Sequence, residues 1–205
     1  TTPLFNFACA HIDEYAGGIM VTASHNPPEY NGFKLSLGNG LAFGKVNGMN
    51  EVHDSIKNKI YSVPEGVELG KVEEFDPFPL YQERIFSFVD PEKIKPLKIV
   101  IDNANGMGYS TFPKLLKSIP QVDVEFLYLE PDGTFPNHEA NPLKTETLKA
   151  LQERVKEVGA DFGFALDADA DRVGLVDNNG EVVDASFLVA ITGLRVLEKN
   201  PGAIM

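Results

Sequence analysis

The sequence contains a single cysteine, Cys9, in 205 residues. An internal disulfide is therefore excluded. A chain with so few cysteines fits a reducing compartment, so we predict a cytoplasmic protein. No apolar run approaches the length of about 18 residues that a membrane-spanning helix needs. The N-terminus also lacks a basic segment followed by an apolar core, so we predict neither a membrane span nor a signal peptide.

Basic residues are scarce as well. Lysine and arginine total 18 against 30 aspartates and glutamates, which gives a formal net charge of −12. Nucleic acids and anionic membranes bind to basic patches, so this balance argues against both as partners. A site for an anionic substrate would need a bound divalent cation, with arginine or lysine nearby, to reverse the local field.

The hydrophobic content of 43% is enough for one large domain or two modest ones. From residue 97 onward, strand and helix patterns alternate three times, which predicts an α/β fold with a parallel or mixed sheet and helices on both faces. Prolines after Asp90 and Lys95 mark a boundary. We therefore expect two α/β domains, each with a mixed or parallel sheet and helices on both faces, over residues 1–90 and 91–182, and the start of a third over 183–205.

The individual elements are predicted from hydrophobic period and turn residues. The expected strands cover residues 19–21, 33–37, 97–102, 122–129 and 161–166, a strand from 172 to the turn at 178–180, a weak strand within 64–74 and the start of a strand at 202–205. The expected helices cover residues 1–10, 51–61, 81–89, 110–118, 143–158 and 185–199, the last with Asp184 as a possible N-cap.

Residues 18–34 carry the first group of chemically active side chains. A short apolar strand ends in a tight turn that two prolines close. A hydroxyl, an imidazole and an amide follow one another at this turn: Ser24, His25 and Asn26. A serine at a sharp turn after a strand can act as a nucleophile, although capping of the turn is the commoner use of an arbitrary serine. Lys34 lies on the next strand, either solvated or aimed at the Ser24 turn.

Three carboxylates form the second group, at the carboxyl end of the strand over 161–166. Asp167, Asp169 and Asp171 are separated only by alanines, and like charges so close repel unless a cation neutralises them. Ligands made only of carboxylates suit Mg²⁺ better than Zn²⁺. An EF-hand is excluded because the pattern requires glycine at the position of Arg172 and glutamate at that of Asn178. A solvated acidic turn is the remaining alternative.

The turn over residues 103–108 contains two glycines after a predicted strand. Gly106 and Gly108 allow two interpretations, a loop that cradles phosphate or a close-packed turn. The G-x-G-x-x-G pattern is absent and neither glycine precedes Lys-Ser/Thr, so the close-packed turn is favoured.

Both groups of side chains resemble motifs of one family. Residues 22–27, which read Thr-Ala-Ser-His-Asn-Pro, resemble the phosphoserine loop of the α-D-phosphohexomutases, the phosphomannomutase and phosphoglucomutase family. The aspartates with Arg172 resemble its magnesium loop, with alanine at two positions where many members carry glycine. Residues 131–138 resemble a loop of its second domain. The resemblance covers the later part of the family's first domain, its second domain and the start of its third, so we expect a fragment that is inactive alone.

The resemblance implies reversible phosphoryl transfer between C6 and C1 of a hexose phosphate. Ser24 would carry the phosphoryl group and, with the three aspartates, bind one Mg²⁺. Lys34 would shuttle the proton of the sugar hydroxyl, with His25 as second choice, while Arg172 and Asn26 would contact phosphate. A hexose 1,6-bisphosphate would be the intermediate and activator. If one ion joins Ser24 to the aspartates, the hydroxyl should lie about 4–7 Å from the nearest carboxylate.

Other functions stay open at this point. Thr22 and residues 30–34 favour the phosphoglucomutase/phosphomannomutase branch over phosphoglucosamine mutase, and they do not set the preferred hexose. A phosphatase or kinase-like enzyme that uses an aspartyl nucleophile would want threonine after an Asp-x-Asp pair, which this chain lacks. A non-catalytic metal- or carbohydrate-binding module would leave the Ser24 loop without a role. The sequence sets no oligomeric state.

Overall fold

The computed structural model describes residues 1–60, 66, 68 and 70–204. The chain divides into two compact units. The N-terminal unit consists of residues 2–23 and 31–89, and the C-terminal unit consists of Thr1, residues 24–30 and everything from Asp90 onward. The turn that carries Ser24 therefore belongs to the C-terminal unit, although the strands on either side of it belong to the other.

The N-terminal unit is built on an antiparallel hairpin, β1 (Gly17–Val21) and β2 (Phe33–Leu37), with Gly18 opposite Ser36. Helix α1 (Thr2–His11) packs on one face of the hairpin, where a Cβ at Gly18 would lie 2.4 Å from the Cys9 sulfur. Ser36 is buried on this face, and Lys34 shares the face because side chains alternate along a strand. Helices α2 (Met49–Lys57) and α3 (Phe78–Phe86) complete the unit.

A five-stranded mixed sheet forms the centre of the C-terminal unit, in the order β4-β3-β5-β6-β7. Strand β3 (Leu97–Asp102) pairs in parallel with β4 (Val122–Leu127) and with β5 (Phe162–Leu166). Strand β6 (Val173–Asp177) returns antiparallel to β5, and β7 (Val182–Val183) follows at the edge. The α/β class with a mixed sheet, expected from the sequence, is confirmed.

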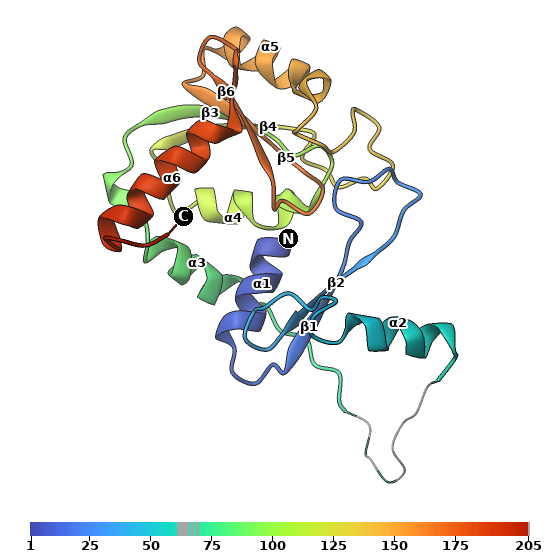
Figure 1. Ribbon diagram of the computed structural model, residues 1–205. Coiled ribbons are helices and arrows are strands. Elements are labelled where there is room, and N and C mark those ends of the chain that lie inside the picture. Colours follow the sequence, from blue (N-terminus) through green and yellow to red (C-terminus); the bar gives the residue numbers. More distant parts are fainter. Residues whose placement is uncertain (61–65, 67, 69, 205) are drawn as a thin grey trace. The chain divides into compact units, whose positions relative to one another are not determined.

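Helices cover both faces of this sheet (Figure 1). Helix α5 (Lys149–Val158) lies on one face and α4 (Phe112–Leu116) on the other. Alternate residues of β3 pack into two different hydrophobic cores, one on each face of the sheet. Val100 packs with the α5 side, and its neighbours Ile99 and Ile101 pack with the α4 side. A strand buried on both faces explains why residues 97–101 are almost uniformly apolar.

Several predicted helices differ at their ends. The helix expected over 110–118 is a 3₁₀ turn (Met107–Ser110) followed by the short α4. The helix expected over 143–158 begins as a 3₁₀ turn (Thr145–Leu148), because Asn141 holds the preceding segment in a turn through its side-chain bond to the Leu143 amide.

Helix α3 begins three residues before the expected position, because the Asp76 carboxylate accepts a hydrogen bond from the Phe78 amide. Val89, the last residue of the expected helix, lies beyond the observed one and is 46% exposed. The sequence also predicts strands within 64–74 and at 202–205. Residues 64, 65, 67, 69 and 205 of these two segments lie outside the described residues. Tyr61, the expected end of the second helix, lies outside them too. The described remainder of both segments forms no strand.

Helix α6 (Ala185–Lys199) matches its prediction, with the Asp184 carboxylate accepting a hydrogen bond from the Ser186 amide at its N-terminus. Among the residues that the structure describes, no helix is both long enough and apolar enough to cross a membrane.

Candidate functional site

The candidate site is built on the connection between β5 and β6. This connection is closed from within, because one oxygen of Asp167, Oδ1, accepts hydrogen bonds from the amides of Asp171 at 3.0 Å and Arg172 at 3.1 Å. Ala170 adopts φ 60°, the left-handed conformation that lets the chain reverse direction. Two hydrogen bonds to a single carboxylate oxygen therefore hold the backbone of this loop together.

The three aspartates of this loop converge. One oxygen from each carboxylate lies within 4.8 Å of the others, so the group could hold a metal ion. Asp167 and Asp169 are buried, whereas the Asp171 side chain keeps 29% of its surface exposed. Buried like charges at this spacing are costly without a cation, and oxygen-only donors fit a hard divalent ion. The expected convergence of the three side chains is therefore found.

Ser24 lies at this cluster. Its hydroxyl is 3.2 Å from Asp167 Oδ2 and 3.3 Å from Asp169 Oδ1, within donor distance of both carboxylates. These distances are shorter than the expected separation of about 4–7 Å for groups joined through an ion, because the hydroxyl donates directly to the carboxylates. Ser24 itself has φ 56°, so the turn holds a non-glycine residue in the left-handed region. Two segments 143 residues apart in sequence thus form one cluster.

The electrostatics of the cluster favour a cation. Burial raises the pKa of Asp167 to about 6, and the charges of Asp169 and Asp171 add to the effect. The hydrogen bonds from the Arg172 backbone and the Ser24 hydroxyl act in the opposite direction without cancelling it. A divalent ion would reverse this balance, because it favours the ionised form of each carboxyl group.

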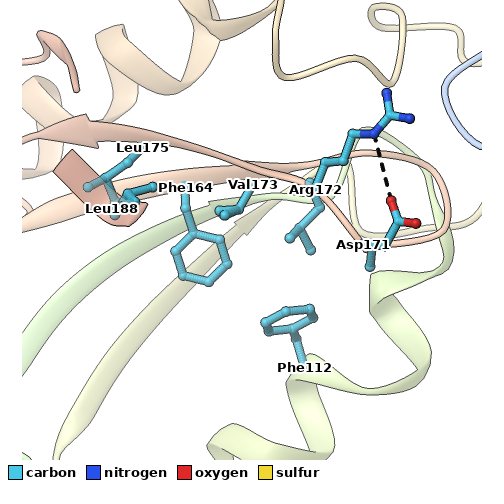
Figure 2. A pocket seen from close by; sticks show the side chains of 9 residues that line it. Phe112, Phe164, Asp171, Arg172, Val173, Leu175 and Leu188 are labelled. Atoms are coloured by element: carbon cyan, nitrogen blue, oxygen red, sulfur yellow. Dashed lines mark ion pairs between the residues drawn. The ribbon is translucent and has the colours of Figure 1, made fainter. Parts of the chain in front are cut away.

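Arg172 connects the aspartate loop to the serine turn. Its Nη1 lies 2.5 Å from His25 Nδ1, and its Nε lies 3.9 Å from both Asp167 Oδ2 and Asp171 Oδ1. A guanidinium can only donate, so His25 accepts at Nδ1. Figure 2 shows the charged ends of Arg172 and Asp171 turned toward each other. Asn26 is exposed in the same turn.

The sequence-predicted residues therefore fall into two groups. The serine turn, the aspartates and Arg172 all belong to the C-terminal unit, whereas Lys34 belongs to the N-terminal unit and is half-buried there.

An apolar cavity of about 370 Å³ lies beside the loop over residues 167–172 in the same unit. Phe112 of α4, Phe164 of β5 and Leu188 of α6 contribute to its lining (Figure 2). Asp171 and Arg172 border the cavity, and their charged ends point away from the two rings. A polar, phosphorylated ligand has few partners here, so the chemistry of the site belongs to the carboxylate cluster instead.

Sequence reasoning missed a buried ion pair at the end of β3. The Asp102 side chain has no exposed surface, and its Oδ2 lies 3.0 Å from Nε2 of His138. The other ring nitrogen of His138, Nδ1, lies 2.9 Å from the Glu139 carbonyl oxygen. Both nitrogens face acceptors, an arrangement that favours the protonated ring, which can donate from both. The only available signal was an aspartate that ends an apolar strand.

This pair predicts a pH-dependent stability. Burial lowers the pKa of His138, but the hydrogen bond to Asp102, its charge and the Glu139 carbonyl outweigh burial, and the pKa is raised above 6.5. A raised histidine pKa stabilises the fold fully below the unfolded value, and the stabilisation is lost as pH rises through the folded value. We expect the free energy of unfolding to fall more between about pH 6 and about pH 9 in wild type than in His138→Gln, measured by urea denaturation.

The matched control is His53→Gln, because the His53 side chain is 72% exposed beside Asp54. Its pH profile should follow wild type. Identical profiles for wild type and His138→Gln would contradict the assignment of a protonated His138.

Comparison with known proteins matches both halves of the chain to one family. Residues 1–62 match the model described as phosphoglucomutase/phosphomannomutase, alpha/beta/alpha domain I, and residues 79–180 match the model for domain II of the same family. A phosphomannomutase/phosphoglucomutase of Pseudomonas aeruginosa is 40% identical over 203 residues, which cover 98% of this chain and 42% of that protein. The chain thus spans less than half the length of the curated relatives it matches.

Solved structures agree. The crystal structure of a phosphoglucomutase/phosphomannomutase family protein from Burkholderia thailandensis matches with a TM-score of 0.82 and 30% identity, over 98% of this chain and 44% of that one. An Aspergillus fumigatus N-acetylphosphoglucosamine mutase, solved in complex with glucose 1,6-bisphosphate, matches with a TM-score of 0.50 and 19% identity, over 93% of this chain and 50% of that one. The latter likeness concerns the fold alone.

Proposed function

The chain belongs to the phosphoglucomutase/phosphomannomutase family, and on that basis we propose that it is the phosphoserine- and metal-binding part of a phosphohexomutase. The reaction is reversible phosphoryl transfer between C6 and C1 of a hexose phosphate. The observation that carries the proposal is the Ser24 hydroxyl within 3.3 Å of two buried aspartates. A serine that only caps its own turn does not require contact with carboxylates from a loop 143 residues away in sequence.

In the proposed reaction Ser24 carries the phosphoryl group. A sugar hydroxyl oxygen forms a bond to phosphorus as the bond from phosphorus to Ser24 Oγ breaks, which yields a hexose 1,6-bisphosphate. After the sugar reorients, its other phosphoryl group returns to Ser24. Such transfers pass through a loose transition state, so positioning and neutralisation of charge are the main tasks of the protein.

The residues of the cluster suit the two tasks of positioning the phosphoryl group and neutralising its charge. Asp167, Asp169 and Asp171, with Ser24, would hold one Mg²⁺, which would neutralise charge on the transferred group. Arg172 is positioned by His25 and can donate to phosphoryl oxygens. Asn26, exposed in the same turn, is a further candidate for a phosphate contact. In a protein as long as the curated relatives, residues 1–90, 91–182 and 183–205 would form parts of three successive domains.

Mass spectrometry tests the proposal directly. We expect the peptide that contains Ser24, taken from a longer protein that includes this chain, to be heavier by one phosphoryl group after incubation with glucose 1,6-bisphosphate. Assays with glucose 1-phosphate, mannose 1-phosphate and glucosamine phosphate would then define the substrate. An unmodified serine with no conversion of any of the three would favour a non-catalytic metal- or carbohydrate-binding module.

Lys34 is proposed as the group that takes and returns the proton of the sugar hydroxyl. The charge of a nearby metal ion can lower the pKa of a lysine enough for this task. We expect Lys34→Met to reduce kcat at least about tenfold in a longer protein that includes this chain, with an unchanged melting temperature. Lys57→Met, at an exposed position of α2, is the control and should keep full activity. An unchanged kcat for Lys34→Met would remove this residue from the mechanism.

A further inference from the structure

The glycine-containing turn between β3 and α4 has no role in the function proposed so far. It spans residues 103–108 and directly follows the strand that neighbours β5 in the sheet. We propose that this turn rigidly supports the connection between β5 and β6, residues 167–172, which we call the metal loop. Gly106 is then a positioning residue for the metal-binding aspartates. The inference rests on the proposed function, because it takes the aspartate loop as the metal site.

The turn and the loop meet through their backbones. The Met107 amide donates a hydrogen bond of 2.7 Å to the carbonyl oxygen of Ala168, the residue between the first two aspartates. A Cβ at Gly106 would lie 2.8 Å from both the Cα and the carbonyl oxygen of Ala168. Side chains can rotate away from such a contact and backbone atoms cannot, so only glycine fits beneath the loop.

Close approach, and not backbone conformation, is what requires glycine here. Gly106 has φ −89° and ψ −168°, an extended conformation open to any residue. An alanine at this position could therefore adopt the same backbone angles, and it would act on the structure mainly by pushing against Ala168, with a looser contact of 3.1 Å to the Asn103 carbonyl oxygen. The sequence interpretation of 103–108 as a close-packed turn is confirmed, and the partner of that packing is the metal loop.

The turn is held in one shape. The buried Asn103 side chain donates from Nδ2 to the Gly106 carbonyl at 2.7 Å and to the Leu129 carbonyl at 3.2 Å. Ala104 and Asn105 have φ 46° and 56°, and two left-handed non-glycine residues in succession persist only where their surroundings fix them. Because the turn cannot relax, a side chain added at Gly106 must displace the metal loop that packs against it.

A second set of contacts anchors the far side of the turn. Asn105 donates from Nδ2 to the Glu130 carbonyl at 2.8 Å and accepts at Oδ1 from Asn137 Nδ2 at 2.8 Å. The turn therefore connects the metal loop to the segment over residues 130–137. We expect displacement of Ala168 to move Asp167 and Asp169, since both flank it directly.

The test compares Gly106→Ala with Gly133→Ala in the chain described here. Gly133 is exposed, and a Cβ there would meet no atom within 4 Å, so it controls for the loss of a glycine. Affinity for Mn²⁺ alone is measured by electron paramagnetic resonance, and the melting temperature is measured in EDTA. We expect Gly106→Ala to weaken Mn²⁺ binding about 10–100-fold, the range typical of groups that orient metal ligands, with a melting temperature close to wild type. Gly133→Ala should match wild type in both.

Equal Mn²⁺ affinity in wild type and Gly106→Ala would overturn the inference and leave the proposed function standing. Weakened binding with a matching loss of melting temperature would also overturn it, since the glycine would then serve the fold in general. A wild-type chain that binds no Mn²⁺ would overturn the metal site itself.

Hydrogen exchange in wild type gives an independent measurement that does not depend on the folding of a variant. We expect Mn²⁺ to slow exchange of the amides over residues 103–108, because Met107 donates to the metal loop. Unchanged exchange there would contradict the proposed support.

Discussion

Replacing Ser24 with alanine should abolish mutase activity in a longer protein that includes this chain. We expect kcat to fall by at least about a thousandfold, because a covalent route that loses its nucleophile has no substitute. The fold should survive, since Ser24 is only half-buried and its hydroxyl lies against two carboxylates that prefer a cation. A coupled assay that converts glucose 1-phosphate to glucose 6-phosphate measures the effect.

The control for this experiment is Ser87→Ala. Ser87 is an exposed serine whose hydroxyl donates a hydrogen bond to the nearby Arg84 carbonyl, so its removal should leave kcat unchanged. Activity close to wild type in Ser24→Ala would return the serine to a capping role, whatever the geometry around it.

The second large effect is expected at Asp169. We predict that Asp169→Asn weakens Mg²⁺ or Mn²⁺ binding about a hundredfold or more. Loss of a group that only orients metal ligands typically weakens binding about 10–100-fold, and this variant removes a charge from one of the proposed ligands itself. The melting temperature of the metal-free chain should stay the same or rise, because Asp169 is buried close to two other carboxylates whose repulsion it adds to.

Asp123→Asn serves as the matched control, since Asp123 is an exposed residue of β4. Its affinity for Mn²⁺ and its stability in EDTA should both equal wild type. A large drop in the metal-free melting temperature of Asp169→Asn would contradict the electrostatic account, because it would mean that the carboxylate stabilises the chain without an ion.

The sequence predicted the order of the elements well, because the relevant signals are local. The run over residues 97–101 is apolar apart from Lys98 and ends before Gly106, and Asp184 precedes a largely apolar helix, so both elements could be predicted from neighbouring residues alone. Helix ends were less predictable. The start of α3 depends on a single bond from Phe78 to Asp76, which competes with nearby alternatives of similar energy.

The members of the site could also be predicted, but their supports could not. Ser24 and the aspartates have residue types that suit their chemistry, so a pattern search finds them. Gly106 and Asp102 act through contacts with Ala168 and His138, and the sequence records neither contact. An aspartate after an apolar strand looks the same in sequence whether it binds a metal or a histidine.

The pairing of β5 with β6 has a consequence for how this loop can evolve. Leu166 pairs with Val173, so the residues from 167 to 172 form the connection of a hairpin whose two ends are fixed by the sheet. An inserted or deleted residue would either disturb the hydrogen bonds from the Asp171 and Arg172 amides to Asp167 within the loop, or shift β6 by one position and turn its buried side chains to the opposite face. We therefore expect the loop to tolerate an exchange of one small residue for another at positions 168 and 170 better than a change of length. Natural variation in this segment should consist of substitutions and contain no insertions or deletions.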